Sequence, residues 1–319
     1  MSQSRKQKIR EDLQKQRRRR RTITTTVIAA IVMTVIIVVI IILQKPPPPP
    51  PPGALGAPIS QTLYSQLSGV SNATLNASIN APGVTGLVSV SGTALTSSST
   101  PELLYIGAEF CPYCAAERWS MVVALAKFGT FTGVPSYMLS SDTDVYPNTP
   151  TLSFRQASYT SNYVSFVSVE TQDRNHQALQ TPTSAQQAVM NQWDPQNSIP
   201  FLDIGGSSAK QYLINAASHS SAQYSPSILA GLNWTEVGMQ LDNPSTAVAK
   251  SVDGAADTII SAICNLDGGL PSNVCSNNYA KIVQAPFAMG QMPPLDQQVK
   301  FQLSYQEVLS SWKNFRQSI

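Results

Sequence analysis

Two cysteines separated by two residues, Cys111 and Cys114, are the side chains whose type and spacing offer chemistry. Such a pair either cycles between dithiol and disulfide or supplies half of a zinc site. A zinc site needs two further ligands. Neither of the two histidines lies near a cysteine, and the remaining cysteines, Cys264 and Cys275, are far along the chain. The spacing therefore favours a redox pair over zinc and over an inert structural disulfide, and no metal is expected.

The segments around this pair predict a strand that leads directly into a helix. The run at residues 103–108 is apolar, and apolar residues recur at helical intervals after the cysteines until Gly129. Cys111 is then at the helix N-terminus, where free backbone N–H groups and the helix dipole favour a thiolate. Pro112 suits the first helical position because its φ is already fixed. We expect Cys111 to attack and Cys114, one turn on, to resolve the mixed disulfide.

At these residues the chain resembles the thioredoxin superfamily. Cys-Pro-Tyr-Cys is similar to the glutaredoxin tetrapeptide, and Ala-Glu-Phe-Cys at 108–111 is similar to the approach to the thioredoxin active site. The motif Phe-Cys-Pro-Tyr-Cys-Ala-Ala-Glu-Arg-Trp at 110–119 resembles a domain-of-unknown-function family of membrane-anchored, thioredoxin-like proteins from archaea and actinobacteria. The resemblance covers residues ~85–275 and includes residues 146–151, residues 199–205 and the pair Cys264 and Cys275.

The resemblance implies an α/β, thioredoxin-like fold. A central mixed sheet would be flanked by helices, with an insertion at about 142–198 before the cis-proline strand. Two prolines compete for the cis position that faces the cysteines, Pro150 and Pro200. We favour Pro200, because a strand, a tight turn, a second strand and a helical stretch follow it in the order of the superfamily's closing unit. The residues expected to contact substrate are Pro200, Ile199, Pro112 and Tyr113.

One position departs from the superfamily pattern. Many members have a buried carboxylate six residues before the first cysteine, where it accepts a proton. Here that position is Tyr105. Glu109 is closer in sequence and is expected to be exposed or to point elsewhere. The departure argues against a thioredoxin-like proton relay and against efficient reduction.

The second cysteine pair, Cys264 and Cys275, follows a predicted helix at residues 247–263. An oxidising exterior favours a structural disulfide here, worth about 3 kcal/mol in the chain-entropy account. A second redox pair that relays electrons to the first is the alternative.

Residues 276–319 are expected to form a C-terminal extension with an amphipathic helix. Met289 and Met292 in this extension, together with Cys111 and Cys114, offer soft ligands of the kind that bind copper.

Residues 22–43 predict a membrane-spanning helix. The run is uncharged, rich in Val and Ile, and ~33 Å long as a helix, enough for a bilayer core of ~30 Å. It is too long for the apolar region of a cleaved signal peptide. Residues 1–21 are basic, so the positive-inside rule predicts a cytosolic stub and an extracellular C-terminal domain. Residues 44–84, with seven consecutive prolines, are interpreted as a Pro-rich and polar linker, and residues 85–275 as the thioredoxin-like domain.

Composition and modification motifs agree with this topology. Residues 1–45 hold 11 Lys or Arg and 2 acids; since the whole chain carries +3, the rest carries −6. An acidic body argues against nucleic-acid binding. Asn72, Asn76 and Asn233 begin glycosylation triplets, as expected outside the cell. Only 12% of residues are charged, which leads to the hypothesis of an acidic medium, where carboxylates would add little solubility.

The leading hypothesis is an enzyme: a membrane-anchored, outward-facing thiol–disulfide oxidoreductase that acts on exported cysteine-containing proteins. It needs no dissociable cofactor. It does need a redox partner, either a thiol protein or a quinone-linked membrane oxidase. The alternative from another class is a cell-surface binding or scaffold protein whose Cys-x-x-Cys is idle, and a third hypothesis is a copper-handling chaperone.

Overall fold

The structure is a computed structural model and describes Met33 and residues 54–92, 94–97, 100–208, 210–214 and 222–276. The chain divides into two units, Met1–Pro48 and Pro49–Ile319. Except for Met33 and Ser276, the expected membrane segment at 22–43 and the expected extension at 276–319 lie outside the described residues. Within the described ranges, no helix combines the length and the apolarity needed to cross a membrane.

A central mixed sheet is built around β3, Thr100–Gly107, which ends four residues before Cys111. β8, Ser165–Glu170, pairs with β3 in parallel, and β9, Phe201–Gly205, pairs with the opposite edge of β3 in antiparallel register. β10, Lys210–Ile214, and β1, Val88–Ser91, continue the sheet beyond β9, and the short β2, Thr96–Ser97, pairs with the beginning of β3.

Residues of β3 alternate between two apolar clusters, because successive side chains of a strand point to opposite faces of the sheet. Leu103 and Tyr105 belong to the larger cluster, and Leu104 and Ile106 belong to the smaller one. All four side chains are buried. Both faces of the sheet are therefore covered, which explains why this strand is a continuous apolar run rather than an alternating one.

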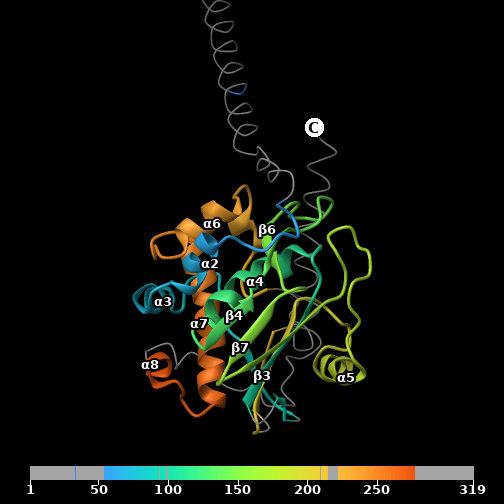
Figure 1. The fold of residues 1–319 in the computed structure, drawn as a ribbon, viewed down its shortest axis with the longest axis vertical. Helices are drawn as coiled ribbons and strands as arrows, with labels where there is room; N and C mark the ends of the chain where they lie inside the picture. The colour runs from blue at the N-terminus through green and yellow to red at the C-terminus, as the bar shows by residue number, and fades with distance from the viewer. Residues whose placement is uncertain are drawn as a thin grey trace, which may run out of the picture. The chain divides into compact units, whose positions relative to one another are not determined.

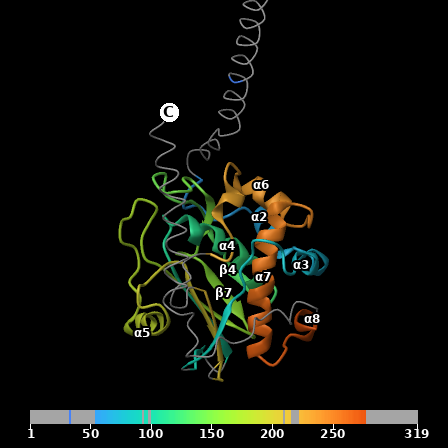
Figure 2. The ribbon, with the colours of Figure 1, turned by 180° about the vertical axis from the view of Figure 1, so that it is seen from behind.

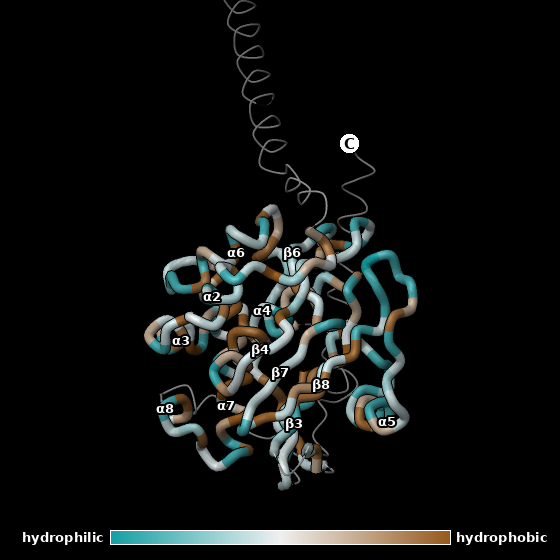
Figure 3. The backbone as a smooth tube through the Cα atoms, viewed as in Figure 1, coloured by the Kyte–Doolittle hydropathy of each residue, from teal (hydrophilic) through white to brown (hydrophobic). Residues whose placement is uncertain are grey.

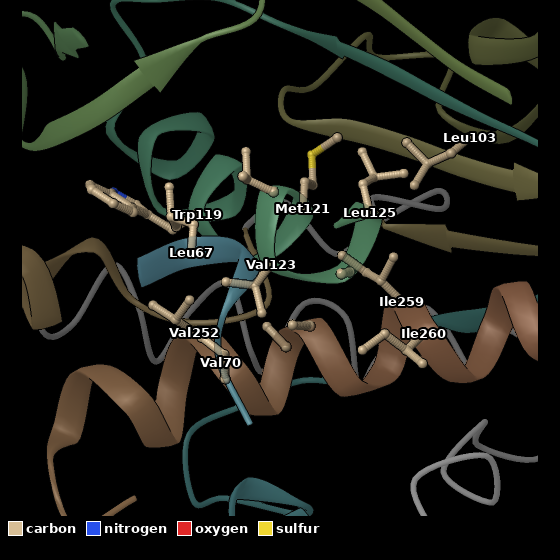
Figure 4. Close-up of a cluster of buried hydrophobic side chains, with 14 of the residues drawn as sticks. Leu67, Val70, Leu103, Trp119, Met121, Val123, Leu125, Val252, Ile259 and Ile260 are labelled. Atoms are coloured by element: carbon tan, nitrogen blue, oxygen red, sulfur yellow. The ribbon is translucent and has the colours of Figure 1, made fainter. Parts of the chain in front are cut away.

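Helices cover the two faces. α4, Pro112–Leu125, and α7, Ala247–Leu266, pack against each other on the side of the larger cluster. Figure 4 shows the apolar contact between them, with Val123 of α4 facing Val252 and Ile259 of α7. α5, Ser184–Trp193, covers the other face, where its Met190 and Trp193 join the smaller cluster.

Shorter elements complete the described part of the chain. They are α2, Gln61–Ser68, α3, Asn72–Ser78, η1, Pro226–Leu229, α6, Trp234–Gln240, and α8, Ser272–Cys275. Two separate pairs of strands are β4, Gly129–Gly133, with β7, Ser158–Ser161, and β5, Ser136–Leu139, with β6, Pro150–Ser153. Figures 1 and 2 show α5 on one side of the sheet and α7, with α2, α3 and α6, on the other.

Residues 61–78 differ from the expected linker, because they form α2 and α3 and belong to the core. Leu67 and Leu75 have no solvent exposure. Ser60 and Ser71 cap the two helices through their side-chain oxygens. Each helix carries few apolar side chains among many Ser, Thr and Asn, so composition hides the helical pattern. The folded domain therefore begins well before residue 85.

The three glycosylation triplets have different surroundings. Asn72 is exposed at the start of α3. Asn76 Oδ1 is buried. The Asn233 side chain caps α6 and accepts the N–H of Glu236. Of the three, Asn72 is the one whose side chain is open to modification without the loss of a local contact.

Candidate active site

Cys111 is the N-cap residue of α4, and Pro112 occupies the first helical position. The Cys114 backbone N–H donates to Cys111 Sγ at 3.4 Å. Both cysteines are free thiols; Cys111 is 6% exposed and Cys114 has no exposure. The outer thiol therefore lies at the positive end of a helix, and the inner one lies under it.

The two thiols differ in acidity. Interaction with the Cys114 thiol lowers the pKa of Cys111, despite burial, and the backbone N–H groups of Cys114 and Tyr113 and the charge of Arg118 act in the same direction. Burial raises the pKa of Cys114 well above its ordinary value. The arrangement favours a thiolate at Cys111 and a protonated Cys114, the polarity that a nucleophile and a resolving thiol require.

The loop before β9 lies against Cys111. The Cys111 thiol approaches the Ile199 carbonyl oxygen at 3.9 Å, and the Ile199–Pro200 peptide bond is cis. The Asp194 carboxylate holds this loop by accepting the backbone N–H groups of Gln196 and Ser198. Ile199 and Pro200 are therefore positioned beside the outer thiol.

Pro150, the other candidate for this position, has a different place. It begins β6, and its carbonyl oxygen accepts the Trp119 indole N–H at 2.9 Å. Pro150 thus attaches β6 to α4. In the ranges that the structure describes, the cis peptide bonds are Ile199–Pro200 and Leu270–Pro271.

Aromatic rings flank the cysteines. Tyr113 is half-buried and makes an edge contact with Tyr146, with ring centres 6.0 Å apart, while Pro112 is buried. Phe110 packs on His176, with ring centres 4.1 Å apart. Tyr146 and His176 come from the segments that follow β5 and β8, so two loops of the expected insertion help to form the rim of the site.

A pocket of about 510 Å³ adjoins the Ile199 loop. Most of its lining residues belong to α5 or to the segments on either side of it, and the segment that leads from β8 to α5 is largely hydrophilic (Figure 3). Its lining consists of Ile106, Thr171, Gln172, Pro182, Gln187, Met190, Asn191, Asn197 and Ile199. None of these residues carries a charge.

A buried ion pair lies under the cysteine helix, and sequence reasoning gave it no role. Arg118 on α4 bonds Glu170 at the end of β8, with Nε–Oε1 and Nη2–Oε2 distances of 2.9 and 2.6 Å. Neither side chain has any exposure. Burial is the largest single influence and lowers the pKa of Arg118, but the charge and hydrogen bonds of Glu170, together with the nearby Tyr105 and Cys114 side chains, hold this pKa above its ordinary value. Arg118 follows Cys114 by one helical turn, and that spacing is the signal that could have indicated it.

Tyr105 is fully buried on the face of the sheet that α4 covers. Within the described residues its hydroxyl has no hydrogen-bond partner, sulfur included. Its ring centre lies 5.7 Å from Arg118 Cζ. Burial raises the pKa of Tyr105 well above its ordinary value, and an interaction with the Cys114 side chain acts in the same direction.

Of the two expectations for Glu109, exposure is wrong, and the side chain instead points to β6. Glu109 is 4% exposed, and the Ser153 hydroxyl donates to Glu109 Oε1 at 2.5 Å. Burial raises the pKa of this carboxyl group, although the Ser153 bond opposes the shift. Ser153 belongs to β6, which lies 44 residues along the chain, so no local pattern around Glu109 could have indicated this partner.

The second cysteine pair is a disulfide. Cys264 of α7 and Cys275 of α8 are joined, with 5.5 Å between their Cα atoms. In the described part of the chain no group of three or more His, Cys, Asp or Glu side chains could hold a metal ion. Met289 and Met292, the residues of the copper hypothesis, lie outside the described residues.

The fold and the site define a mixed α/β protein with a free dithiol at a helix N-terminus beneath an irregular loop. Residues 86–265 match the family described as Domain of unknown function (DUF929), and the chain belongs to this family. Searches of curated proteins and of solved structures found no significant match.

Proposed function

We propose that the chain is a thiol–disulfide oxidoreductase with a thioredoxin-like fold. One observation carries the proposal: Cys111 Sγ lies at the N-terminus of α4, receives the Cys114 N–H at 3.4 Å, and lies 3.9 Å from the Ile199 carbonyl oxygen. A thiolate, a resolving thiol and a carbonyl that can pair with a substrate backbone are thus adjacent. These are the parts that disulfide exchange requires.

The order of elements supports a thioredoxin-like fold. A central strand, β3, enters α4 at the cysteines, a parallel strand, β8, lies on one edge, and two antiparallel strands, β9 and β10, lie on the other. α7 then returns across the face that α4 covers. This is the arrangement that the resemblance at residues 108–119 and 199–205 implies.

Disulfide exchange takes place in two steps, and in each step a thiolate attacks a disulfide and displaces another thiolate. The Cys111 thiolate attacks one sulfur of a substrate disulfide, a mixed disulfide forms, and the other substrate sulfur leaves as a thiolate. Deprotonated Cys114 then attacks Cys111 Sγ, the mixed disulfide breaks, and the substrate leaves as a dithiol. Two electrons have moved from the protein to the substrate, and the reverse sequence oxidises a substrate dithiol.

Alkylation of Cys111 tests this proposal. The full chain, reduced in detergent, is titrated with iodoacetamide from pH 3 to 10, with Cys111→Ser to identify the signal. We expect reaction to persist below the range of a free thiol, whose pKa is ~8.5, and we expect Cys114→Ser to accumulate a mixed disulfide with a disulfide-bonded peptide. A Cys111 that does not react at any pH would contradict the proposal.

A non-catalytic binding or scaffold protein is the second candidate. The observation that favours it is the burial of Cys111, which is 6% exposed. In this case the neutral pocket beside Ile199 would bind a partner, and the thiols would be inert. Binding of exported proteins by both the wild type and Cys111→Ser, without mixed disulfides, would favour this candidate.

The basic residues 1–21 and the apolar residues 22–43 support a location in the cell membrane, with the N-terminus in the cytosol and the C-terminal domain outside. Protease added to sealed, right-side-out vesicles should then remove the domain and leave a short N-terminal fragment. The substrates of this domain would be exported cysteine-containing proteins. Its redox partner would be a thiol protein or a quinone-linked membrane oxidase, and no dissociable cofactor is needed.

A further inference from the structure

The pocket of about 510 Å³ beside the Ile199 loop adjoins Cys111 from two directions. Ile199 lines the pocket, and its carbonyl oxygen lies 3.9 Å from Cys111 Sγ. Gln172 also lines the pocket, and its carbonyl oxygen accepts the backbone N–H of Glu109 at 2.9 Å. Glu109 is two residues before Cys111 in the chain. The pocket is therefore next to the outer thiol, and a molecule bonded to Cys111 can extend into it.

One wall of the pocket is a face of α5 that regular structure holds in place. Gln187, Met190 and Asn191 line this wall, and residues three and four apart in a helix share a face. Met190 is buried in the smaller apolar cluster, and the capping box of Thr183 and Gln186 fixes the start of the helix. The polar groups of this wall are therefore positioned before any ligand binds.

Three amide side chains of the pocket form a network that leaves hydrogen-bonding groups unused. Gln187 Nε2 donates to Asn191 Oδ1 at 2.9 Å and to Asn197 Oδ1 at 2.5 Å. These two bonds use both hydrogens of the Gln187 amide. Within the described ranges, Gln187 Oε1 and Asn191 Nδ2 make no hydrogen bond. An acceptor and a donor are thus left on the pocket wall, and these are the groups that the amides of a bound polypeptide can pair with.

The pocket offers no opposite charge to a charged side chain. None of its lining residues is acidic or basic. Asp194, the acid of the adjoining loop, is buried and accepts the backbone N–H groups of Gln196 and Ser198. A charged group that entered the pocket would lose part of its water and find no ion-pair partner in exchange, which costs free energy. An uncharged group would meet amide and apolar side chains instead.

We propose that this pocket binds uncharged residues next to the reactive cysteine of an extended polypeptide substrate, with Gln187 and Asn191 as the specificity-determining residues. The inference rests on the proposed function and names the substrate class of the same site. An extended chain advances about 3.4 Å per residue, so residues within about three positions of a cysteine bonded to Cys111 reach the pocket beside Ile199. Polypeptides with neutral residues around the cysteine therefore react faster than polypeptides with charged ones.

The first test measures the preference of the wild type. The reduced full chain in detergent is mixed with peptides whose single cysteine is carried as a pyridyl disulfide, and Cys111→Ser gives the background. The Cys111 thiolate attacks the peptide sulfur, a mixed disulfide forms, and the pyridinethione that leaves is followed by absorbance. Each peptide carries Asn, Leu, Asp or Lys at one position, from three before to three after the cysteine. Each rate is divided by that of the same peptide with mercaptoethanol, which removes intrinsic differences in reactivity.

The expected result is a preference for neutral peptides. At one or two of these positions the Asn and Leu peptides should react about tenfold faster than the Asp and Lys peptides, the effect of a polar group that is buried without a partner. Both signs of charge should be disfavoured, because the lining is neutral. Glutathione carried as the same pyridyl disulfide is the competing small occupant, and it should react no faster than the charged peptides.

The second test gives the pocket a charge. In Asn191→Asp the Lys peptide should become about tenfold faster relative to the Asp peptide, and in Asn191→Lys the order should reverse, because complementary charges select the partner. The matched controls are Gln192→Asp and Gln192→Lys, since Gln192 is the next residue of α5, is also exposed and does not line the pocket. In about 0.15 M salt, which screens charges that face solvent, these controls should keep the wild-type preference. All variants should react alike with the pyridyl disulfide of mercaptoethanol, which is too small to reach the pocket.

The outcomes separate this inference from the proposed function. If Cys111 releases no pyridinethione from any peptide, the proposed function fails. If Cys111 reacts but shows no preference beyond that of mercaptoethanol, the inference alone is overturned. It is also overturned if the Gln192 variants change the preference as much as the Asn191 variants do, or if glutathione reacts faster than the neutral peptides. Asn191 is exposed, so its substitution leaves the core intact, and either of its two variants decides the question.

Discussion

Gly107 leaves the space in which the Tyr105 ring lies. The two residues are on the same face of β3, because side chains two apart in a strand point the same way. A Cβ at Gly107 would collide with Tyr105 Oη and with the neighbouring ring carbons. We predict that Gly107→Ala lowers the free energy of unfolding by about 1–3 kcal/mol, the range for overpacking. Urea denaturation of the wild type and the variant measures this difference.

A double-mutant cycle isolates the cause. In a Tyr105→Leu background the ring is gone, so Gly107→Ala should cost much less than it does in the wild type. Equal costs in both backgrounds would show that the collision with Tyr105 is not the reason, and that the strand backbone itself rejects a side chain.

At the level of single residues, local spacing indicated part of the site. The Cys111–Cys114 spacing, with a strand before it and a helix after it, was enough to place the thiols at a helix N-terminus. Arg118 shares a helix face with Cys114, but its partner Glu170 is 52 residues away. Only the pairing of Gly107 with Glu170 across β3 and β8 brings that carboxylate under the helix. Contacts of this kind depend on sheet register, which a single sequence does not specify.

At the scale of elements, α4 is attached to β6 by side chains as well as by apolar packing. The Trp119 indole N–H donates to the Pro150 carbonyl, and Thr151 Oγ1 donates to the Ala115 carbonyl. We predict that Trp119→Phe lowers the free energy of unfolding by about 1–3 kcal/mol, because it leaves a buried carbonyl without its donor. Trp193→Phe on α5 is the matched control, since the Trp193 indole N–H has no acceptor. If both variants lose a similar amount of unfolding free energy, ring packing alone would explain the effect of Trp119→Phe.

A second prediction at the scale of helices and strands concerns the disulfide between α7 and α8. It joins two residues that are eleven positions apart, so replacing both Cys264 and Cys275 by alanine should cost about 3 kcal/mol of unfolding free energy. Alkylation of Cys111 should keep its wild-type pH dependence. The alternative, a relay of electrons from this disulfide to Cys111 and Cys114, predicts the reverse: altered reoxidation of the first pair in a variant that is nearly as stable.

Helices and strands could be predicted from the sequence where the apolar pattern was long. Prediction was poorer where this pattern was short or interrupted. The helical pattern at 247–263 corresponds to α7, Ala247–Leu266. The helical stretch expected after the two strands that follow Pro200 begins at Pro226 and is divided into η1 and α6, because Gly231 has a φ of +80° and Asn233 starts a new helix. The short apolar pattern at 136–140 corresponds to β5, which pairs with β6, outside the central sheet. Which strand pairs with which depends on the whole core rather than on the strand itself.

At the scale of the whole domain, four carboxyl groups of the described residues have no solvent exposure and no cationic partner in direct contact. They belong to Glu117, Asp203, Asp253 and Asp257. Burial raises the pKa to about 7 for Glu117, to about 8 for Asp203 and Asp253, and to about 9 for Asp257. Lys127 opposes the shifts of Asp253 and Asp257 but does not cancel them. Burial therefore favours the neutral form of these groups in the folded domain.

The direction in which folding stability changes with pH follows from the difference between the folded and unfolded pKa values. In the unfolded chain these carboxyl groups have a pKa of about 4. A group whose folded pKa is higher binds its proton more tightly in the native state, so its contribution to stability is complete below pH ~4 and is lost as the pH rises through the folded pKa. Each such group contributes up to about 1.4 kcal/mol per pH unit within that window. The window here extends from about pH 4 to the folded values near 7 to 9.

We predict that the domain is most stable in acid, in agreement with the hypothesis of an acidic medium. The urea midpoint of the full chain should fall steadily from pH 4 to pH 9, and Asp253→Asn combined with Asp257→Asn should make this fall shallower, since two ionisations are removed. Asp142→Asn, an exposed carboxyl group, should leave the slope unchanged. A wild-type midpoint that is constant or rises over this range would contradict the prediction, because it would mean that the buried carboxyl groups ionise without cost.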